Sequence, residues 1–335
     1  MSSFSLGDLA QTFMLQRRGA ALKMDMARLN EEVATGQVSD IKSVLAGNVS
    51  YLADIENDLK SLEGYGIATS EATQFSQAMQ TALEHIQSST SNLGTTLLTR
   101  STSAIEPILD QFSSEARSEM ETLVNALNTK SAGRALFAGS ATDQQALANA
   151  DTILAAVRVA TAGATNPQDI IDAANTWFDD PAGFTAEIYT GSNESLAPLR
   201  LGKGESVSLQ HKANDQVFRN ALKHVAIAAI AGDDSFNLSI ESRRELLTET
   251  GNSLIDAHGA LTAASATVGT AQARIDALAT RNSTEENALL IAKGALVQSD
   301  PFEAATELEA VQFQLQSLYA ITARMSDMSF VNFIR

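Results

Sequence analysis

A stretch from Leu247 to Leu296 repeats apolar or small residues at alternating spacings of three and four. Large aliphatic residues alternate with alanine along much of this repeat. Such heptad spacing is typical of a helix that packs along a second helix as a coiled coil. Asn282 and Glu285 interrupt the repeat, and we expect them to face water or to fix the register. The chain is therefore predicted to be built around a very long helix.

The N-terminal part predicts three further helices. Residues 1–35 carry one apolar face, and Gly36 is expected to end that helix. A second heptad repeat runs from Asn48 to Leu93, with a stammer between Leu62 and Ala68 through which we expect the helix to continue. A third helix is predicted from Pro107 to near Gly133, because proline favours the first helical position.

The C-terminal residues 310–335 contain only three charged residues and predict one continuous helix. Asp300 is its expected N-cap, Pro301 its first residue and Glu303 the partner of a capping box. Its leading seam consists of Ala304, Leu308, Val311, Leu315, Leu318, Thr322 and Met325. Apolar residues outside this seam are Phe313, Tyr319, Ile321, Met328, Phe330, Val331, Phe333 and Ile334. One partner helix could not cover both sets, so several neighbours are required. A membrane span is disfavoured, because no run of about 18 apolar residues exists.

Residues 139–236 differ from the rest of the chain, because their sequence predicts shorter elements and more turns. Helices are predicted at Gln144–Arg158 and Gln168–Phe178, and strands at Phe184–Tyr189, Leu196–Leu201 and Ser206–Leu209. The apolar helix Gln216–Ala231 is expected to cover this small sheet.

The predicted fold class is mainly α: a long coiled-coil helical rod formed by the N- and C-terminal segments, with an inserted α+β domain. Three domains are expected. Residues 1–40 plus 300–335 form terminal helices that are flexible in the monomer, residues 41–138 plus 237–299 form the rod, and residues 139–236 form the outer domain.

Composition excludes several function classes. The net charge of −17 opposes binding to nucleic acid and anionic membranes. Cysteine is absent, so disulfides and thiolate sites are excluded. The four histidines, at 85, 211, 224 and 258, have no second ligand at metal-site spacing. No catalytic motif was found, so we expect no enzymatic activity, no cofactor and no metal. Met1–Leu15 lacks the pattern of a cleavable secretory signal.

Two motifs resemble the flagellin family. The run from Ser299 to Ile334, beginning SDPFEAATEL, looks like the closing signature of that family, and Leu127–Ser140 looks like the turn after its third helix. Residues 36–43 lack the arginine, asparagine and paired aspartates that filament flagellins usually carry there, which disfavours an ordinary filament subunit.

The resemblance implies a structural protein of the bacterial flagellum that connects hook-side subunits to the flagellin filament. Filament flagellin is the alternative, and a secreted enzyme or adhesin acting through residues 139–236 is a remote one. Implied partners are other axial proteins, including flagellin, further copies of this chain in a ring-like layer, and an export chaperone. The implied location is extracellular, after export through the flagellar secretion apparatus without signal cleavage.

The terminal helices are the implied assembly interface. Their expected contact residues are Leu6, Leu9, Phe13, Leu22, Met26, Leu29, Leu308, Val311, Leu315, Leu318, Met325, Met328, Val331 and Phe333. We expect Leu318 to be accessible in the single chain and buried only on assembly, whereas Leu261 should be buried in both states.

Overall fold

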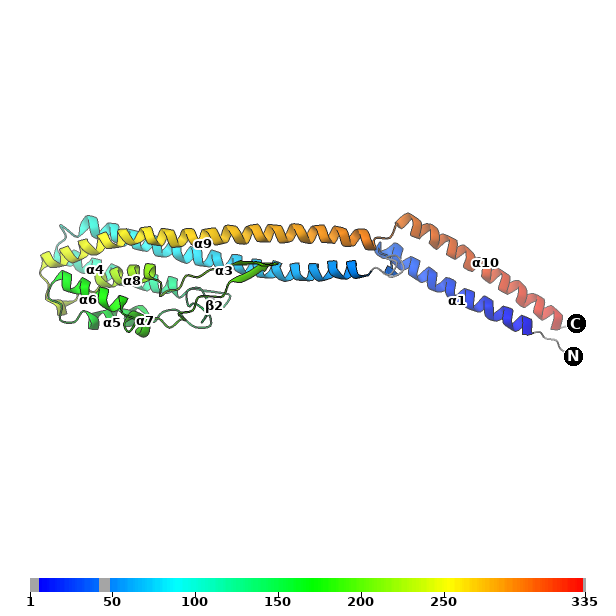
Figure 1. The fold of residues 1–335 in the computed structure, drawn as a ribbon, viewed down its shortest axis with the longest axis horizontal. Coiled ribbons are helices and arrows are strands. Elements are labelled where there is room, and N and C mark those ends of the chain that lie inside the picture. The colour runs from blue at the N-terminus through cyan, green and yellow to red at the C-terminus, as the bar shows by residue number, and fades with distance from the viewer. Residues whose placement is uncertain (1–5, 42–48, 334–335) are drawn as a thin grey trace. The chain divides into compact units, whose positions relative to one another are not determined.

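The computed structural model describes residues 6–41 and 49–333, and within these ranges the side chains of 10–41 and 49–325. The fold is mainly α-helical with an inserted α+β segment, as predicted (Figure 1). It divides into two compact units, one made of Met1–Leu62 with Thr284–Arg335 and the other of Glu63–Ser283.

The first unit contains α1 (Leu6–Thr35) and α10 (Pro301–Phe333), which pack side by side in opposite directions. The predicted boundaries are confirmed at Gly36, whose φ of +68° ends α1, and at Asp300. The Asp300 carboxylate accepts hydrogen bonds from the backbone amides of Phe302 at 2.8 Å and Glu303 at 3.3 Å. These two amides would otherwise lack partners at the start of α10.

Two long helices provide the framework of the second unit. α3 (Ser50–Arg100) passes through the predicted stammer without a break, and α9 (Ile240–Val297) is the predicted long helix. They run antiparallel, as shown by hydrogen bonds from Gln80 to Ser265 at 2.6 Å and between Ser101 and Thr248 at 2.8 Å. The heptad residues of α9 are confirmed as its inner face, since Leu254, Leu261 and Ile275 are fully buried.

The third predicted helix is α4 (Glu106–Leu127). It ends earlier than predicted, because residues 130–135 form a hairpin of the two-residue strands β1 (Lys130–Ser131) and β2 (Arg134–Ala135). The remaining elements belong to the inserted segment. They are α5 (Ala150–Ala160), α6 (Pro167–Asp179), α7 (Phe184–Glu187), β3 (Leu199–Gly202), β4 (Glu205–Val207), α8 (Gln216–Ile230) and the short 3-10 helix η1 (Asp234–Phe236).

One predicted strand is wrong. Residues 184–189 form the short helix α7 and then a single β-bridge from Tyr189 to Leu147. The helical turn places Phe184 against Phe178 with stacked rings 5.1 Å apart, and both side chains are fully buried. Aromatic packing with α6 therefore overrides the alternating sequence pattern.

The prediction that the helix at residues 216–231, α8, covers the small sheet is also wrong. α8 packs on α4, α5 and α6, and its central residues Val225–Ile230 are fully buried in the main core. The antiparallel β3–β4 hairpin instead lies on the α3/α9 pair, where Leu201 and Val207 join a cluster with Ala72, Ile275 and Leu278.

Candidate assembly interface

The α1/α10 pair is held together by an apolar seam. Leu22, Leu29 and Leu318 are 7%, 1% and 9% exposed in the single chain. Gly19 sits opposite Leu318, and a Cβ at position 19 would lie only 3.1 Å from Leu318 Cδ2. The missing side chain therefore allows the two helices to approach closely. Near this crossing, Lys23 Nζ lies 5.8 Å from the ring centroid of Tyr319, a cation–π distance.

The structure places the expected contact residues in three groups. Leu22, Leu29 and Leu318 are buried; Met26, Leu308, Val311, Leu315 and Met325 are half-buried; and Phe13 is exposed. The side chains of Leu6, Leu9, Met328, Val331 and Phe333 lie outside the described residues. The residues on the inner face of the pair thus belong to the predicted seam. Within a single chain, α1 and α10 bury only part of that seam.

The expectation for Leu318 is wrong for the single chain. Its side chain is already 9% exposed without any second copy, because α1 covers it at Gly19. Gly19 was missed as a contact position, although it continues the apolar stripe of Leu22 and Met26 at heptad spacing. A glycine at such a position signals close helix approach rather than a gap in the stripe.

Large apolar side chains cover the outer face of the same pair. Exposed fractions reach 66% for Phe13, 70% for Phe313 and 81% for Phe302. The other exposed large apolar residues of the pair are Met14, Met24, Val33, Tyr319 and Ile321. A soluble chain rarely exposes so many neighbouring large apolar groups, which indicates a protein interaction surface. The outer faces of both helices are therefore uncovered in the single chain, and that several partners cover them stays a prediction.

The base of the pair is fixed by backbone bonds. Val38 N donates to Val297 O at 2.9 Å, and Ser299 N donates to Gly36 O at 3.0 Å. The buried carboxylate of Glu32 accepts from Arg28 Nη1 at 2.9 Å and from Ser39 N at 3.1 Å. The end of α1 and the start of α10 are consequently held together within the first unit.

The described residues contain no cluster of metal ligands. No three His, Cys, Asp or Glu side chains cluster as a metal site within the described part of the chain. His224 lies half-buried on α8, where desolvation and the nearby charge of Lys223 lower its pKa to about 4. Asn282 is buried, and its Nδ2 donates to Leu201 O at 2.7 Å, so it anchors the β3–β4 hairpin. It does not face water.

Among residues 6–41 and 49–333, none of the helices combines the length and the hydropathy that a membrane span requires.

Residues 253–334 match the family model of the bacterial flagellin C-terminal helical region. The matched segment contains about the last three quarters of α9 and the whole of α10. The C-terminal quarter of the chain is thus similar to that region of flagellins. The search among curated proteins found no match.

A solved structure shares the fold. It comes from Vibrio parahaemolyticus and is assigned as a flagellar hook-associated protein. The match has a TM-score of 0.51 and 12% identity, and it covers 75% of this chain and 99% of the other. At this identity the likeness concerns the fold.

Proposed function

We propose that this chain is a structural subunit of the bacterial flagellum. The observation that carries the proposal is the coincidence of two features in α10. The helix lies within the segment that matches the flagellin C-terminal region, and it exposes Phe302, Phe313, Tyr319 and Ile321. An apolar outer face on a flagellin-type helix is what a subunit buried among other axial subunits requires.

Within the flagellum, the proposed position is the junction between hook and filament, as in hook-associated protein 3. The motif at Leu127–Ser140 and the departure at residues 36–43 favour this role over that of filament flagellin. The fold shared with a chain assigned as hook-associated agrees with the choice. The partners would be hook-associated protein 1 on one side and flagellin on the other, with further copies of this chain in a ring-like layer.

The role proposed for the interface is mechanical. Each buried Leu, Ile, Phe or Met contributes roughly 1.5 to 3 kcal/mol. Covering even a few of the exposed side chains would therefore outweigh the cost of ordering them. No enzymatic step is needed, and the chain would reach its extracellular position through the flagellar export apparatus, assisted by an export chaperone.

A single-cysteine label tests the location. The chain has no cysteine, and Lys203 is an exposed residue in the turn between β3 and β4. Lys203→Cys, expressed in place of the native protein and reacted with a maleimide dye on intact cells, should give one focus at the base of each filament. The unsubstituted chain is the control and should give no label.

Other patterns would decide against the junction. Label along the whole filament would identify a filament subunit, the alternative role. Label in the medium or on the cell body, with none on flagella, would overturn the structural role and favour a secreted enzyme or adhesin.

A further inference from the structure

The charges of the α1/α10 pair are separated into two halves. Gly19 lies opposite Leu318, and Gly36 is bonded to Ser299, so residues 10–24 share one half with residues 310–325. The described side chains of this first half include four cations and no carboxylate. The cations are Arg17, Arg18, Lys23 and Arg324. The sequence adds Asp8, Asp327 and Arg335 beyond the described side chains, which leaves this half cationic.

The other half, residues 25–36 with 299–309, has the opposite sign. Against one cation, Arg28, it carries seven carboxylates: Asp25, Glu31, Glu32, Asp300, Glu303, Glu307 and Glu309. Glu32 is buried, and the other six are exposed. Figure 1 shows the two helices side by side, with both chain ends at the cationic end.

Among the described residues, few of these charges have a partner of opposite sign. In the described part of the pair, the single ion pair joins Arg28 Nη1 to Glu32 Oε1 at 2.9 Å. Arg17, Arg18 and Arg324 are exposed and have no carboxylate partner among the described residues. The two charged halves are therefore free to interact with another molecule.

A second copy of the chain matches this pattern when it is shifted. Two copies side by side in register would place like charges together, which is repulsive. When both helices are taken together, the cations centre level with Arg18 of α1, and the carboxylates centre level with Glu31, about 13 residues further along. At about 1.5 Å per residue this separation is roughly 20 Å.

We propose that a second copy docks its α1/α10 pair in parallel, displaced along the helix axis by roughly 20 Å. The cationic half of one copy then lies against the carboxylate half of the next. An antiparallel copy would also match charges, but two such copies would close into a dimer. The choice of the parallel copy therefore rests on the proposed function, which requires a continuing assembly. Only the shifted parallel contact leaves a free half at each end and continues through an assembly.

Apolar side chains accompany both charged halves. Phe13, Phe313 and Ile321 are exposed on the cationic half, and Phe302 and Val33 on the carboxylate half. Association would bury these groups, whereas the charges would select the partner and set its register.

Charge reversal tests the complementarity. One variant is Arg17→Glu with Arg18→Glu, and the other is Glu307→Arg with Glu309→Arg. Each variant alone should associate at least about tenfold more weakly than the unsubstituted chain. An equimolar mixture of the two should associate again, and salt near 0.5 M should weaken it, because screening lengths fall to a few Å. Sedimentation velocity of the purified full chain measures each state.

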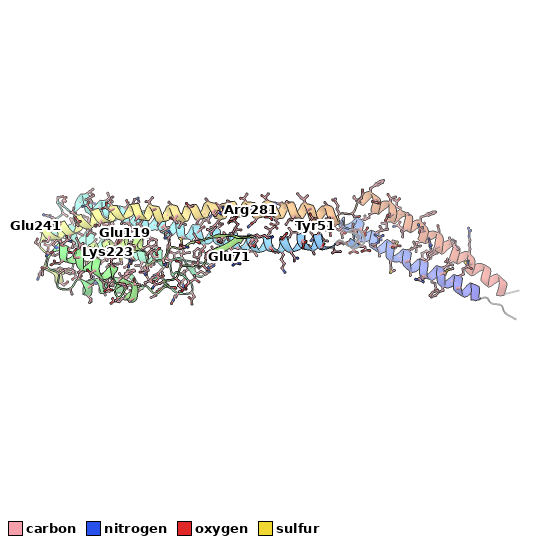
Figure 2. All side chains as sticks on the ribbon, viewed as in Figure 1. Tyr51, Glu71, Glu119, Lys223, Glu241 and Arg281 are labelled. Carbon is pink, nitrogen blue, oxygen red and sulfur yellow. The ribbon has the colours of Figure 1, made fainter. Side chains whose placement is uncertain are left out.

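A matched control keeps the test specific. Glu241→Arg with Glu245→Arg makes the same charge change on exposed residues at the start of α9, in the other unit (Figure 2 labels Glu241). This variant should associate like the unsubstituted chain. An unsubstituted chain that stays monomeric at low salt, or a mixture that stays monomeric, would overturn the inference.

Introduced cysteines test the register. Ala20, Ala27 and Ala34 are exposed at heptad spacing on α1. In the proposed arrangement, Ala20→Cys mixed with Ala34→Cys should be linked by a short bis-maleimide, whereas Ala27→Cys should not link to itself. Self-linking of Ala27→Cys alone would show an antiparallel pair, and self-linking of all three would show an in-register pair. Either result overturns the proposal.

The two proposals can fail separately. Flagellar labelling that persists in both reversal variants would overturn the charge inference and leave the structural role standing. Association that follows the charge pattern in a chain absent from flagella would overturn the structural role alone.

Discussion

The helix α10 approaches α1 most closely where Leu318 faces Gly19. The Leu318 Cδ2 atom is 3.1 Å from where a Cβ at position 19 would be, a distance tighter than most real Cβ contacts. Any larger residue at position 19 must therefore displace Leu318 or separate the helices. Among the described glycines of the pair, Gly19 is the one at which an added Cβ would meet the opposite helix.

Gly19→Leu should weaken the α1/α10 pair. The added side chain would clash with Leu318, which costs about 1 to 3 kcal/mol for an overpacked contact. Amide hydrogen exchange should become faster in α1 and α10 and remain unchanged in α9. Gly259→Leu is the matched control, because nothing lies within 4 Å of the Cβ position at 259. Equal protection of α1 in both variants would show that Gly19 does not limit the approach.

Three aspartate substitutions separate folding, pairing and assembly. Leu261 is fully buried between long helices, Leu318 is 9% exposed within the pair, and Phe313 is 70% exposed. Leu261→Asp should unfold the second unit, because an unpaired buried charge costs several kcal/mol. Leu318→Asp should leave that unit folded but open the α1/α10 pair, while Phe313→Asp should alter neither.

Melting curves and flagellar attachment measure these outcomes together. We expect Phe313→Asp to prevent attachment despite unchanged melting and unchanged exchange in α1, since its carboxylate would be buried only on assembly. Attachment at the level of the unsubstituted chain would show that the outer face of α10 is not an interface.

The sequence predicted the long helices well because their pattern is local. Heptad spacing repeats along each helix, and the terminating Gly36 and the N-cap Asp300 act within a few residues. The inserted segment depended on distant contacts. Phe184 is helical because it packs on Phe178. Asn282 is buried because it bonds to Leu201, which lies 81 residues away in the sequence. Single-sequence patterns contain neither contact.

The candidate interface shows the same division. The stripe through Leu22 and Leu318 was visible as heptad spacing, and both residues are buried. The burial of Leu318 within one chain could not be predicted, because it depends on the close approach at Gly19.

Asn282→Leu should release the β3–β4 hairpin from α9. The amide donates to Leu201 O at 2.7 Å, and its loss leaves a buried carbonyl unpaired at a cost of roughly 1 to 3 kcal/mol. Arg274 and Arg281 also reach Glu205, at 2.5 Å and 3.5 Å, so the hairpin should loosen rather than unfold (Figure 2 labels Arg281). Amide exchange of the hairpin residues measures this. Asn252→Leu, on an exposed position of α9, should leave that exchange unchanged.

The last prediction concerns acid stability. Burial, and then the charge of Lys223, lower the pKa of His224 from 6.5 to about 4 in the folded chain. Between these values the unfolded state binds the proton more strongly, so His224 makes the free energy of unfolding decrease as pH falls from about 6.5 to about 4. Above this window His224 is neutral in both states and has no effect. The full loss is at most about 3.5 kcal/mol, at about 1.4 kcal/mol per pKa unit.

His224→Leu removes this titration while keeping an apolar group in the same half-buried position. Urea unfolding of both chains is measured at several pH values. The difference between the two chains is free of the contribution of the carboxylates, because these groups titrate in both. The variant should lose less stability on acidification, and the difference between the two chains should grow from pH 6.5 down to about 4 and then stay constant. Parallel stability curves over that window would show that His224 binds its proton equally in both states and that its burial carries no energetic cost.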